Sequence, residues 1–219
     1  MQVADFIKRF RESVADQPDG HFWSDKEIVG YLNEAVQEAC ERAKLIEDRS
    51  MSLSLVAGQD TYNLHTSVFE IKRLTLRGRP LHETSVEALD CDWPGWEGRS
   101  GVPRGFIFEQ ASGVQPPKVR LVPTLVAAEA AGLTVYRGAL NPLVAAVTSG
   151  QPEIPERFHE RLMDWVFHRA YLKQDADTFD PNKGAISLAL FVQAFGERPD
   201  ANVQRKQRDI APPLVRSNW

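Results

Sequence analysis

The predicted fold is organised around residues 152–180, PEIPERFHERLMDWVFHRAYLKQDADTFD. Pro155 suits the first position of a helix, because no hydrogen bond is lost there and the φ angle of proline is already helical. Apolar residues then follow at three- and four-residue steps along one side of the helix: Phe158, Leu162, Trp165, Val166 and Ala170. Asp180 precedes a proline, which disfavours the α region, so one helix is expected to end there and another to begin at Pro181. The stretch predicts a core helix and carries no catalytic motif.

Two more helices are predicted at the start of the chain. Residues 2–15 place their apolar side chains on one face, as in a short amphipathic helix. Next, Ser24 and Glu27 have the spacing of a capping box, in which each side chain accepts a hydrogen bond from the other residue's amide. Trp23 and Ile28 are placed as the hydrophobic staple that accompanies such a box. The helical period then continues to residue 46, which predicts about six turns.

The middle of the chain has the pattern of β structure. Residues 52–56 and 61–64 alternate apolar and polar side chains around a turn at 58–60, which predicts a hairpin. Further strands are expected at residues 68–76, from residue 81, and at 105–109, 118–122 and 133–137. A short capped helix is expected near residues 84–89.

A fourth helix is predicted from Pro181, with these residues on its inner side: Ile186, Leu190, Phe191, Ala194 and Phe195. A pair of helices alone would leave an apolar stripe in water, so we expect the N- and C-terminal pairs to pack together. The sequence therefore predicts an α+β protein. It consists of a four-helix bundle from residues 1–48 and 151–203, an inserted antiparallel β domain at 49–150, and an extended C-terminal arm at 204–219.

The arm, QRKQRDIAPPLVRSNW, differs from the rest of the chain in charge. The whole chain carries a net charge of −4 and the arm carries +3, so residues 1–203 carry −7. Pro212 and Pro213 favour an extended form. A disordered terminus is one interpretation, but spaced apolar residues among basic ones favour a segment that docks on a partner and orders there. The candidate docking residues are Arg205, Lys206, Arg208, Ile210, Leu214, Val215, Arg216 and Trp219.

Composition restricts the class of protein. The hydrophobic fraction of 42% and the charged fraction of 26% are those of an ordinary soluble protein. The negative net charge argues against a protein that wraps nucleic acid, because neutralising phosphates requires a basic surface. Cys40 and Cys91 have no metal or redox spacing, so we expect free thiols in a reducing compartment. The N-terminus lacks the apolar core of a secretory signal, and the protein is expected to be soluble and cytoplasmic.

Residues that could carry chemistry are few. His159, Asp164 and His168 lie on the predicted core helix and could form a metal or acid–base site. However, Asp164 and His168 are four residues apart, a spacing that is common for ordinary pairs on a helix surface. The sequence has no glycine-rich phosphate loop, nucleophile elbow or zinc-protease motif. It therefore predicts no catalytic, cofactor-binding or metal-binding residue.

Two other groups of residues have a functional and a structural interpretation. Asp175, Asp177 and Asp180 resemble a cation-binding loop but lack the glycine and the distal glutamate of a calcium site, so we expect helix caps. Trp93 and Trp96 could stack on nucleic-acid bases. Their neighbours are a proline and a glycine, which favours tryptophans that pack within a loop.

Several segments together resemble the head–tail adaptor, or connector, proteins of tailed bacteriophages. The segments that carry the resemblance are WSDKEIVGYLNEAVQEACERA (23–43), SLVAGQDTYNL (54–64), PRGFIF (103–108), PEIPERFHERLMDWVFHRAYLKQDADTFDP (152–181) and FVQAFGERP (191–199). The resemblance implies a virion protein assembled in the host cytoplasm. It also implies a ring of helical-bundle subunits, commonly a dodecamer, beneath the portal protein, with a C-terminal arm that anchors each subunit to the portal.

The same resemblance implies a channel through which genomic DNA passes without sequence-specific binding. The −7 charge of residues 1–203 fits such a channel, because like charge repels phosphate. The β insertion is then expected to meet tail, nozzle or tail-terminator proteins. Two alternatives remain: a small metal-dependent hydrolase that uses His159, Asp164 and His168, and a DNA-binding module that uses the basic arm.

Overall fold

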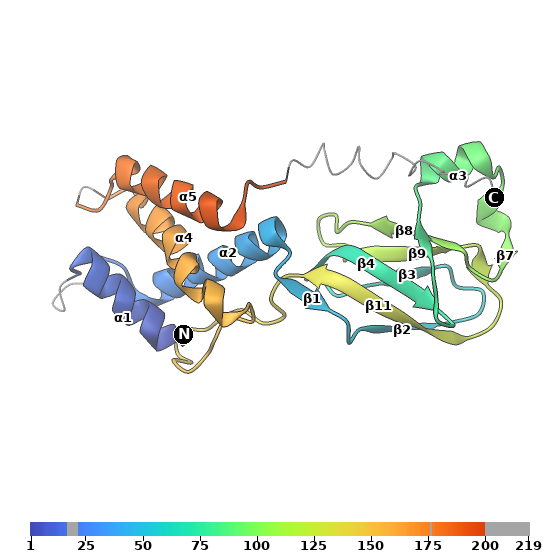
Figure 1. Ribbon diagram of the computed structural model, residues 1–219, viewed down its shortest axis with the longest axis horizontal. Helices are drawn as coiled ribbons and strands as arrows, with labels where there is room; N and C mark the ends of the chain where they lie inside the picture. Colours follow the sequence, from blue (N-terminus) through green and yellow to red (C-terminus); the bar gives the residue numbers. More distant parts are fainter. Residues whose placement is uncertain (17–21, 176, 200–219) are drawn as a thin grey trace, which may run out of the picture. The chain divides into compact units, whose positions relative to one another are not determined.

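Helices from the two ends of the chain pack together, although a long β segment separates them in sequence (Figure 1). The computed structural model describes residues 1–16, 22–175 and 177–199. Two compact units form: a helical unit, Met1–Ile46 with Arg137–Arg198, and a β unit, Glu47–Tyr136. The mixed α+β class expected from the sequence is confirmed. The predicted arm at 204–219 lies outside the described residues.

The described residues of the helical unit form four α-helices and one 3-10 turn. They are α1 (Val3–Val14), α2 (Asp25–Ala43), η2 (Glu156–Phe158), α4 (His159–Tyr171) and α5 (Pro181–Phe195). The capping box at the start of α2 is confirmed, because the Ser24 hydroxyl accepts from the Glu27 amide at 3.2 Å and the Glu27 carboxylate accepts from the Ser24 amide at 2.8 Å. The predicted end of α2 was too late. Lys44 turns into the left-handed region, and Ile46 begins a strand instead.

The core helix α4 is also shorter than the sequence predicts. It ends at Tyr171, and the following loop folds back until the Asp180 amide donates to the Tyr171 carbonyl at 3.0 Å. The carboxylate of Asp180 then accepts from the Lys183 amide at 3.0 Å, so it caps α5. The helix cap predicted for Asp180 is therefore confirmed, and α5 begins at Pro181 as expected.

An aromatic row joins α1, α2 and α4 in the core of the helical unit. The Phe10 ring meets Trp23 edge-on at 5.3 Å and stacks on Phe167 at 5.6 Å between ring centroids. The Trp23 indole N–H donates to the Ala170 carbonyl at 3.3 Å, so this buried aromatic residue is also hydrogen-bonded. Trp23, just before α2, therefore attaches α2 to α4, a helix from the C-terminal part of the chain.

The β unit contains eleven strands, the first of which begins at Ile46 in the helical unit, together with a short helix and a 3-10 turn. They are β1 (Ile46–Asp48), β2 (Ser52–Leu55), β3 (Thr61–Asn63), β4 (Val68–Leu76), β5 (Arg79–Pro80), β6 (His82–Glu83), α3 (Val86–Asp92), η1 (Trp96–Gly98), β7 (Ser100–Gly101), β8 (Gly105–Glu109), β9 (Lys118–Val122), β10 (Thr124–Leu125) and β11 (Glu129–Arg137). One sheet has the order β1-β11-β4-β5 with β2 also on β11, and another has the order β3-β9-β8-β6. Most pairs are antiparallel, but β6 runs parallel to β8 and β7 runs parallel to β10.

The hairpin predicted for residues 52–64 is wrong. β2 pairs with β11, whereas β3 pairs with β9 in the other sheet. The turn between them therefore carries the chain from one sheet to the other. The Tyr62 hydroxyl holds this crossing, because it accepts from the Val56 amide at 3.0 Å and donates to the Gln59 carbonyl at 2.8 Å.

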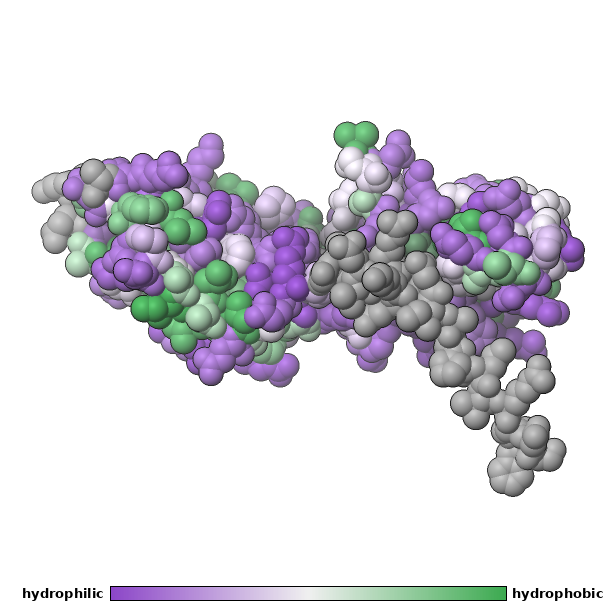
Figure 2. Space-filling model, turned by 90° about the horizontal axis from the view of Figure 1, so that it is seen from above, coloured by the Kyte–Doolittle hydropathy of each residue, from purple (hydrophilic) through white to green (hydrophobic). Residues whose placement is uncertain are grey.

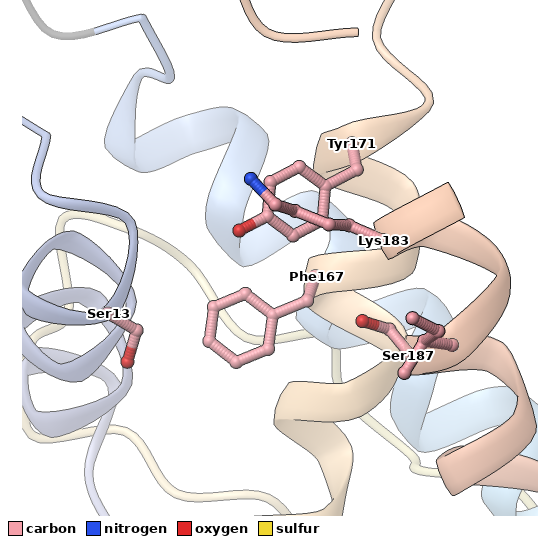
Figure 3. A pocket seen from close by; sticks show the side chains of 6 residues that line it. Ser13, Phe167, Tyr171, Lys183 and Ser187 are labelled. Atoms are coloured by element: carbon pink, nitrogen blue, oxygen red, sulfur yellow. The ribbon is translucent and has the colours of Figure 1, made fainter. Parts of the chain in front are cut away.

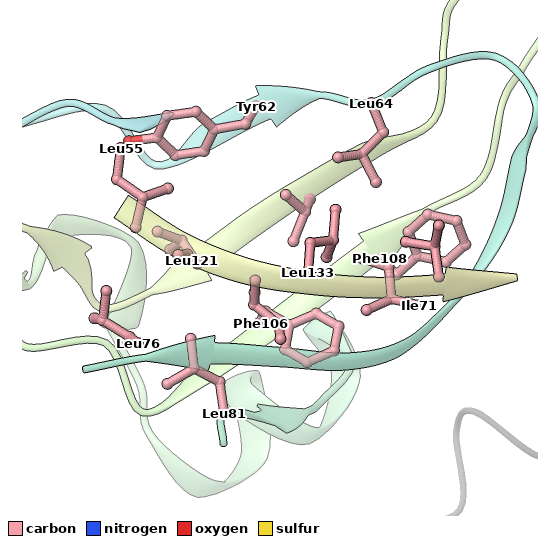
Figure 4. Packing of buried hydrophobic residues seen from close by; sticks show 14 of the residues in the cluster. Leu55, Tyr62, Leu64, Ile71, Leu76, Leu81, Phe106, Phe108, Leu121 and Leu133 are labelled. Atoms are coloured by element: carbon pink, nitrogen blue, oxygen red, sulfur yellow. The ribbon is translucent and has the colours of Figure 1, made fainter. Parts of the chain in front are cut away.

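The main core of the β unit lies between these two sheets (Figure 4). Alternate residues of β8 face it, including Phe106 and Phe108, while Ile107 points to the opposite face and packs with Trp96. Trp96 is buried, and its indole N–H donates to Asp90 at 2.9 Å. The prediction that Trp96 packs within its loop is confirmed. Both faces of β8 are covered, which explains its continuous apolar run.

Candidate docking surface of the helical unit

The docking residues predicted in the arm, from Arg205 to Trp219, lie outside the described residues. Within the described residues, the helical unit presents a different candidate surface on α5. Five exposed residues recur along one side of this helix: Ala185, Ile186, Ala189, Leu190 and Gln193. Ile186 is 63% exposed and Leu190 is 41% exposed. We call these five residues the α5 face, and Figure 2 shows apolar side chains gathered on this part of the helical unit.

The α5 face corrects the sequence prediction, which placed Ile186 and Leu190 on the inner side of the helix. The inner side is formed by Gly184, Phe191 and Phe195. Gly184 lies against the C-terminal part of α4, where its carbonyl accepts from the His168 ring at 2.9 Å. Phe191 and Phe195 are buried, and Phe191 packs on Trp165 of α4 at 5.1 Å between ring centroids, so Ile186 and Leu190 point outward.

A groove of about 270 Å³ runs between α1, α4 and α5 beside the α5 face (Figure 3). Its lining residues are Ser13, Phe167, Tyr171, Lys183, Ile186 and Ser187. The ring of Phe167 points from α4 toward α1, with Ser13 on the opposite side of the groove. Phe167 stacks on Tyr171, so two aromatic rings form one wall of the groove.

The single charge in the groove is already engaged by neighbouring groups. The Lys183 ammonium lies 5.4 Å above the Tyr171 ring and 3.4 Å from the Asp180 carboxylate. The pKa of Asp180 is lowered, first because its carboxylate accepts a hydrogen bond from the Lys183 amide. Aromatic walls and a neutralised charge suit an apolar side chain from another protein better than a polar small molecule.

The proposed metal site on α4 is not assembled. His159 is buried, and its ring nitrogens lie 2.9 Å from the Met1 amine and 2.9 Å from the Ile154 carbonyl oxygen. His168 is engaged by Gly184 as described above. Among the described residues, no group of three or more histidine, cysteine, aspartate or glutamate side chains is placed to hold a metal ion.

Asp164, the third residue of the candidate metal site, is partly buried. One of its carboxylate oxygens is buried without a hydrogen-bond partner, 3.9 Å from the Arg161 guanidinium. Burial raises the pKa of Asp164, and the nearby Arg161 charge only partly opposes this effect. Neither histidine is among the groups that perturb this carboxylate.

One signal in the sequence could have revealed the α5 face. Lys183 is the only charged residue in the fifteen positions of α5. A helix that lies on a protein surface normally has charged residues on its outer side, and a helix that is apolar all round is normally buried. Apart from Lys183, the outer side of α5 therefore lacks the charged residues that a solvent-facing side normally carries.

The helical unit therefore presents exposed apolar residues on α5 beside a groove with an aromatic wall. In a comparison with family models, residues 1–216 match the family described as SU10 adaptor protein. The match covers nearly the whole chain, so the chain belongs to this family of phage head–tail adaptor proteins, as the resemblance in its sequence implies. A search of curated proteins finds no match. No helix in the described ranges is long and apolar enough to cross a membrane.

Proposed function

We propose that this protein forms a ring beneath the portal of a tailed phage, joins the portal to the tail and lets the genome pass. The observation that carries the proposal is the family match over residues 1–216. The uncharged α5 face supports it, because a chain that repeats in a ring needs apolar surfaces for its neighbours. Adaptor families indicate a structural role in the virion and not a catalytic one.

In this proposal the two ends of the chain form one body. The helical unit acts as the bundle of the ring, commonly with twelvefold symmetry, and the β unit, Glu47–Tyr136, acts as a domain that meets tail, nozzle or tail-terminator proteins. The charge of −7 on residues 1–203 would let DNA slide past without adhering.

The arm is proposed to anchor each subunit to the portal. Its apolar residues would enter a groove on the portal, and its basic residues would meet acidic side chains around that groove. The apolar anchors are Ile210, Leu214, Val215 and Trp219, and the basic residues are Arg205, Lys206, Arg208 and Arg216.

Deletion of residues 204–219 tests this role. The truncated chain should remain folded, because α5 ends at Phe195, before the arm begins, and it should lose binding to the portal protein of the same phage. Two full-length variants act as matched controls, one with the four apolar anchors changed to serine and one with the four basic residues changed to glutamine. The serine variant should bind weakly at any salt concentration, and the glutamine variant should lose mainly the salt-dependent part of binding. Unchanged affinity after truncation would show that the arm is not the anchor.

A further inference from the structure

Besides the α5 face, the helical unit has a second uncharged surface. Residues 138–151, GALNPLVAAVTSGQ, contain no acidic or basic side chain. Three apolar residues of this segment are exposed: Leu140, Val144 at 54% and Val147 at 52%. Exposed apolar residues that occur close together, without charges among them, are typical of an interface core.

This segment has no helix or strand of its own, yet hydrogen bonds hold it in place. Asn33 of α2 pairs with both backbone groups of Leu143, at 2.9 and 2.8 Å. The first amides of α1 donate to its other end, from Val3 to the Gly150 carbonyl at 2.8 Å and from Ala4 to the Thr148 carbonyl at 3.1 Å. The apolar side chains are thus presented by an ordered backbone, which lowers the entropic cost of binding.

The two uncharged surfaces lie on opposite sides of the same unit. In the view of Figure 1, α5 lies along the top of the helical unit, and the segment between β11 and α4 passes along its bottom. Two different surfaces that lie on opposite sides of one unit are not both covered by a single twofold contact. They can both be covered when copies associate head to tail, an arrangement that closes into a ring.

We propose that the α5 face of one copy is covered by residues 138–151 of the next copy. This inference rests on the proposed ring, in which these two surfaces would form the contact between neighbouring copies. Both are apolar and uncharged, so each fits the other. The arm fits the α5 face less well, because it carries four basic residues and α5 contains no acidic residue.

Cysteine cross-linking in assembled phage particles tests the contact. The protein carries Val144→Cys and Ile186→Cys together, in a chain whose exposed Cys91 is replaced by serine, while the buried Cys40 is kept. Oxidised particles should then yield a ladder of cross-linked multimers on a non-reducing gel, because each copy is linked to two neighbours. Each single-cysteine variant should remain monomeric, because a head-to-tail contact does not bring two identical positions together.

Two outcomes would overturn the proposed contact, and a third would overturn the proposed function. Dimers from the Ile186→Cys variant alone would show a twofold contact instead. Particles that contain the double variant but give no ladder would show that another molecule, such as the arm or a tail protein, covers α5. Particles formed with the unsubstituted protein that nevertheless lack it would overturn the proposed function, and this result is visible on the same gel as a missing band.

A charge substitution provides an independent measurement. Ile186→Glu should lower the number of copies per particle at least about tenfold, because it buries an unpaired carboxylate in the contact. Val126→Glu is the matched control, since Val126 of the β unit is 60% exposed and lies outside both surfaces. Circular dichroism of both purified variants should match the original protein, because neither substitution alters a core residue. Normal incorporation of a folded Ile186→Glu variant would contradict the inference.

Discussion

Asn33 and Leu143 bind each other through two hydrogen bonds, although they are 110 positions apart in sequence. The Asn33 amide donates to the Leu143 carbonyl at 2.9 Å, and its side-chain oxygen accepts from the Leu143 amide at 2.8 Å. One side chain therefore satisfies both backbone groups of a residue in a segment without secondary structure. This pair attaches residues 138–151 to α2.

Replacing Asn33 with alanine should release this attachment. We expect the free energy of unfolding to fall by about 1–2 kcal/mol, because two partly buried backbone groups lose their partner. Hydrogen exchange at the Leu143 amide should accelerate at the same time. Asn141→Ala is the control, since Asn141 is an exposed asparagine of the same segment, and its effect should be within about 0.5 kcal/mol. Continued protection of the Leu143 amide in the Asn33 variant would contradict the prediction.

Glu27 should make stability depend on acidic pH. Its pKa is lowered from 4.5 to about 2, first because its carboxylate accepts a hydrogen bond from the Lys173 ammonium at 2.8 Å, and next because it accepts from the Ser24 amide. A carboxylate with a lowered pKa stabilises the folded state fully above the pKa of the unfolded chain. This contribution is lost as the pH falls from about 4.5 to about 2.

Glu27→Gln tests that dependence, because glutamine retains the capping geometry but not the charge. Since Glu27 is 38% exposed, solvent screening limits the loss at pH 7 to about 1 kcal/mol or less. The difference in unfolding free energy between the two proteins should vanish near pH 2. Glu12→Gln, which removes a mostly exposed partner of Lys8, should have almost no effect at any pH. A difference that stayed constant with pH would rule out the charge as its cause.

Two glycines at the ends of α5 should respond in opposite directions to alanine. A Cβ atom at Gly184 would lie 3.5 Å from the Leu172 side chain, which is ordinary van der Waals contact, and alanine is the better helix former. Gly184→Ala should therefore raise the unfolding free energy by about 0.5–1 kcal/mol. Gly196 has open space around it, but its φ of 86° and ψ of 175° are strained for any residue with a side chain. Gly196→Ala should cost about 1–3 kcal/mol, and thermal denaturation of both variants measures the two signs.

A core substitution in one compact unit should destabilise that unit and leave the other unchanged. Leu121 is buried between the sheets of the β unit, and Leu162 is buried among the helices. Each substitution by alanine should cost about 2–5 kcal/mol of local stability through the cavity that it leaves. Hydrogen exchange should accelerate in β8 and β9 for Leu121→Ala and in α2 and α4 for Leu162→Ala. Equal acceleration in both units from either variant would show that they unfold as one.

Features that depend on neighbours in sequence were predicted well. The capping box of Ser24 and Glu27, the cap from Asp180 and the start of α5 at Pro181 all agree with the structure. Strands β8 and β9 have the predicted bounds. In each case a few adjacent residues supply both the interaction and its pattern, so the sequence shows it directly.

Features that depend on a distant partner were not predictable in the same way. β2 and β3 look like a hairpin because both alternate around a turn, yet each finds a better partner from elsewhere in the chain. Alternation shows which side chains share a face but not which strand lies beside them. The groove beside α5 likewise combines α1 with α4 and α5, which no local pattern connects.

Patterns in the sequence were enough to specify the α+β class, most of the helices and strands, and membership in the SU10 adaptor family. The buried side of α5, in contrast, follows from packing between helices that are distant in sequence. A helical period can distinguish an apolar side from a charged one, but α5 is apolar on both sides, so its period does not choose between them. The choice depends on partners that are distant in sequence: Phe191 packs on Trp165 of α4 and Phe195 packs on Phe158, which leaves Ile186 and Leu190 exposed.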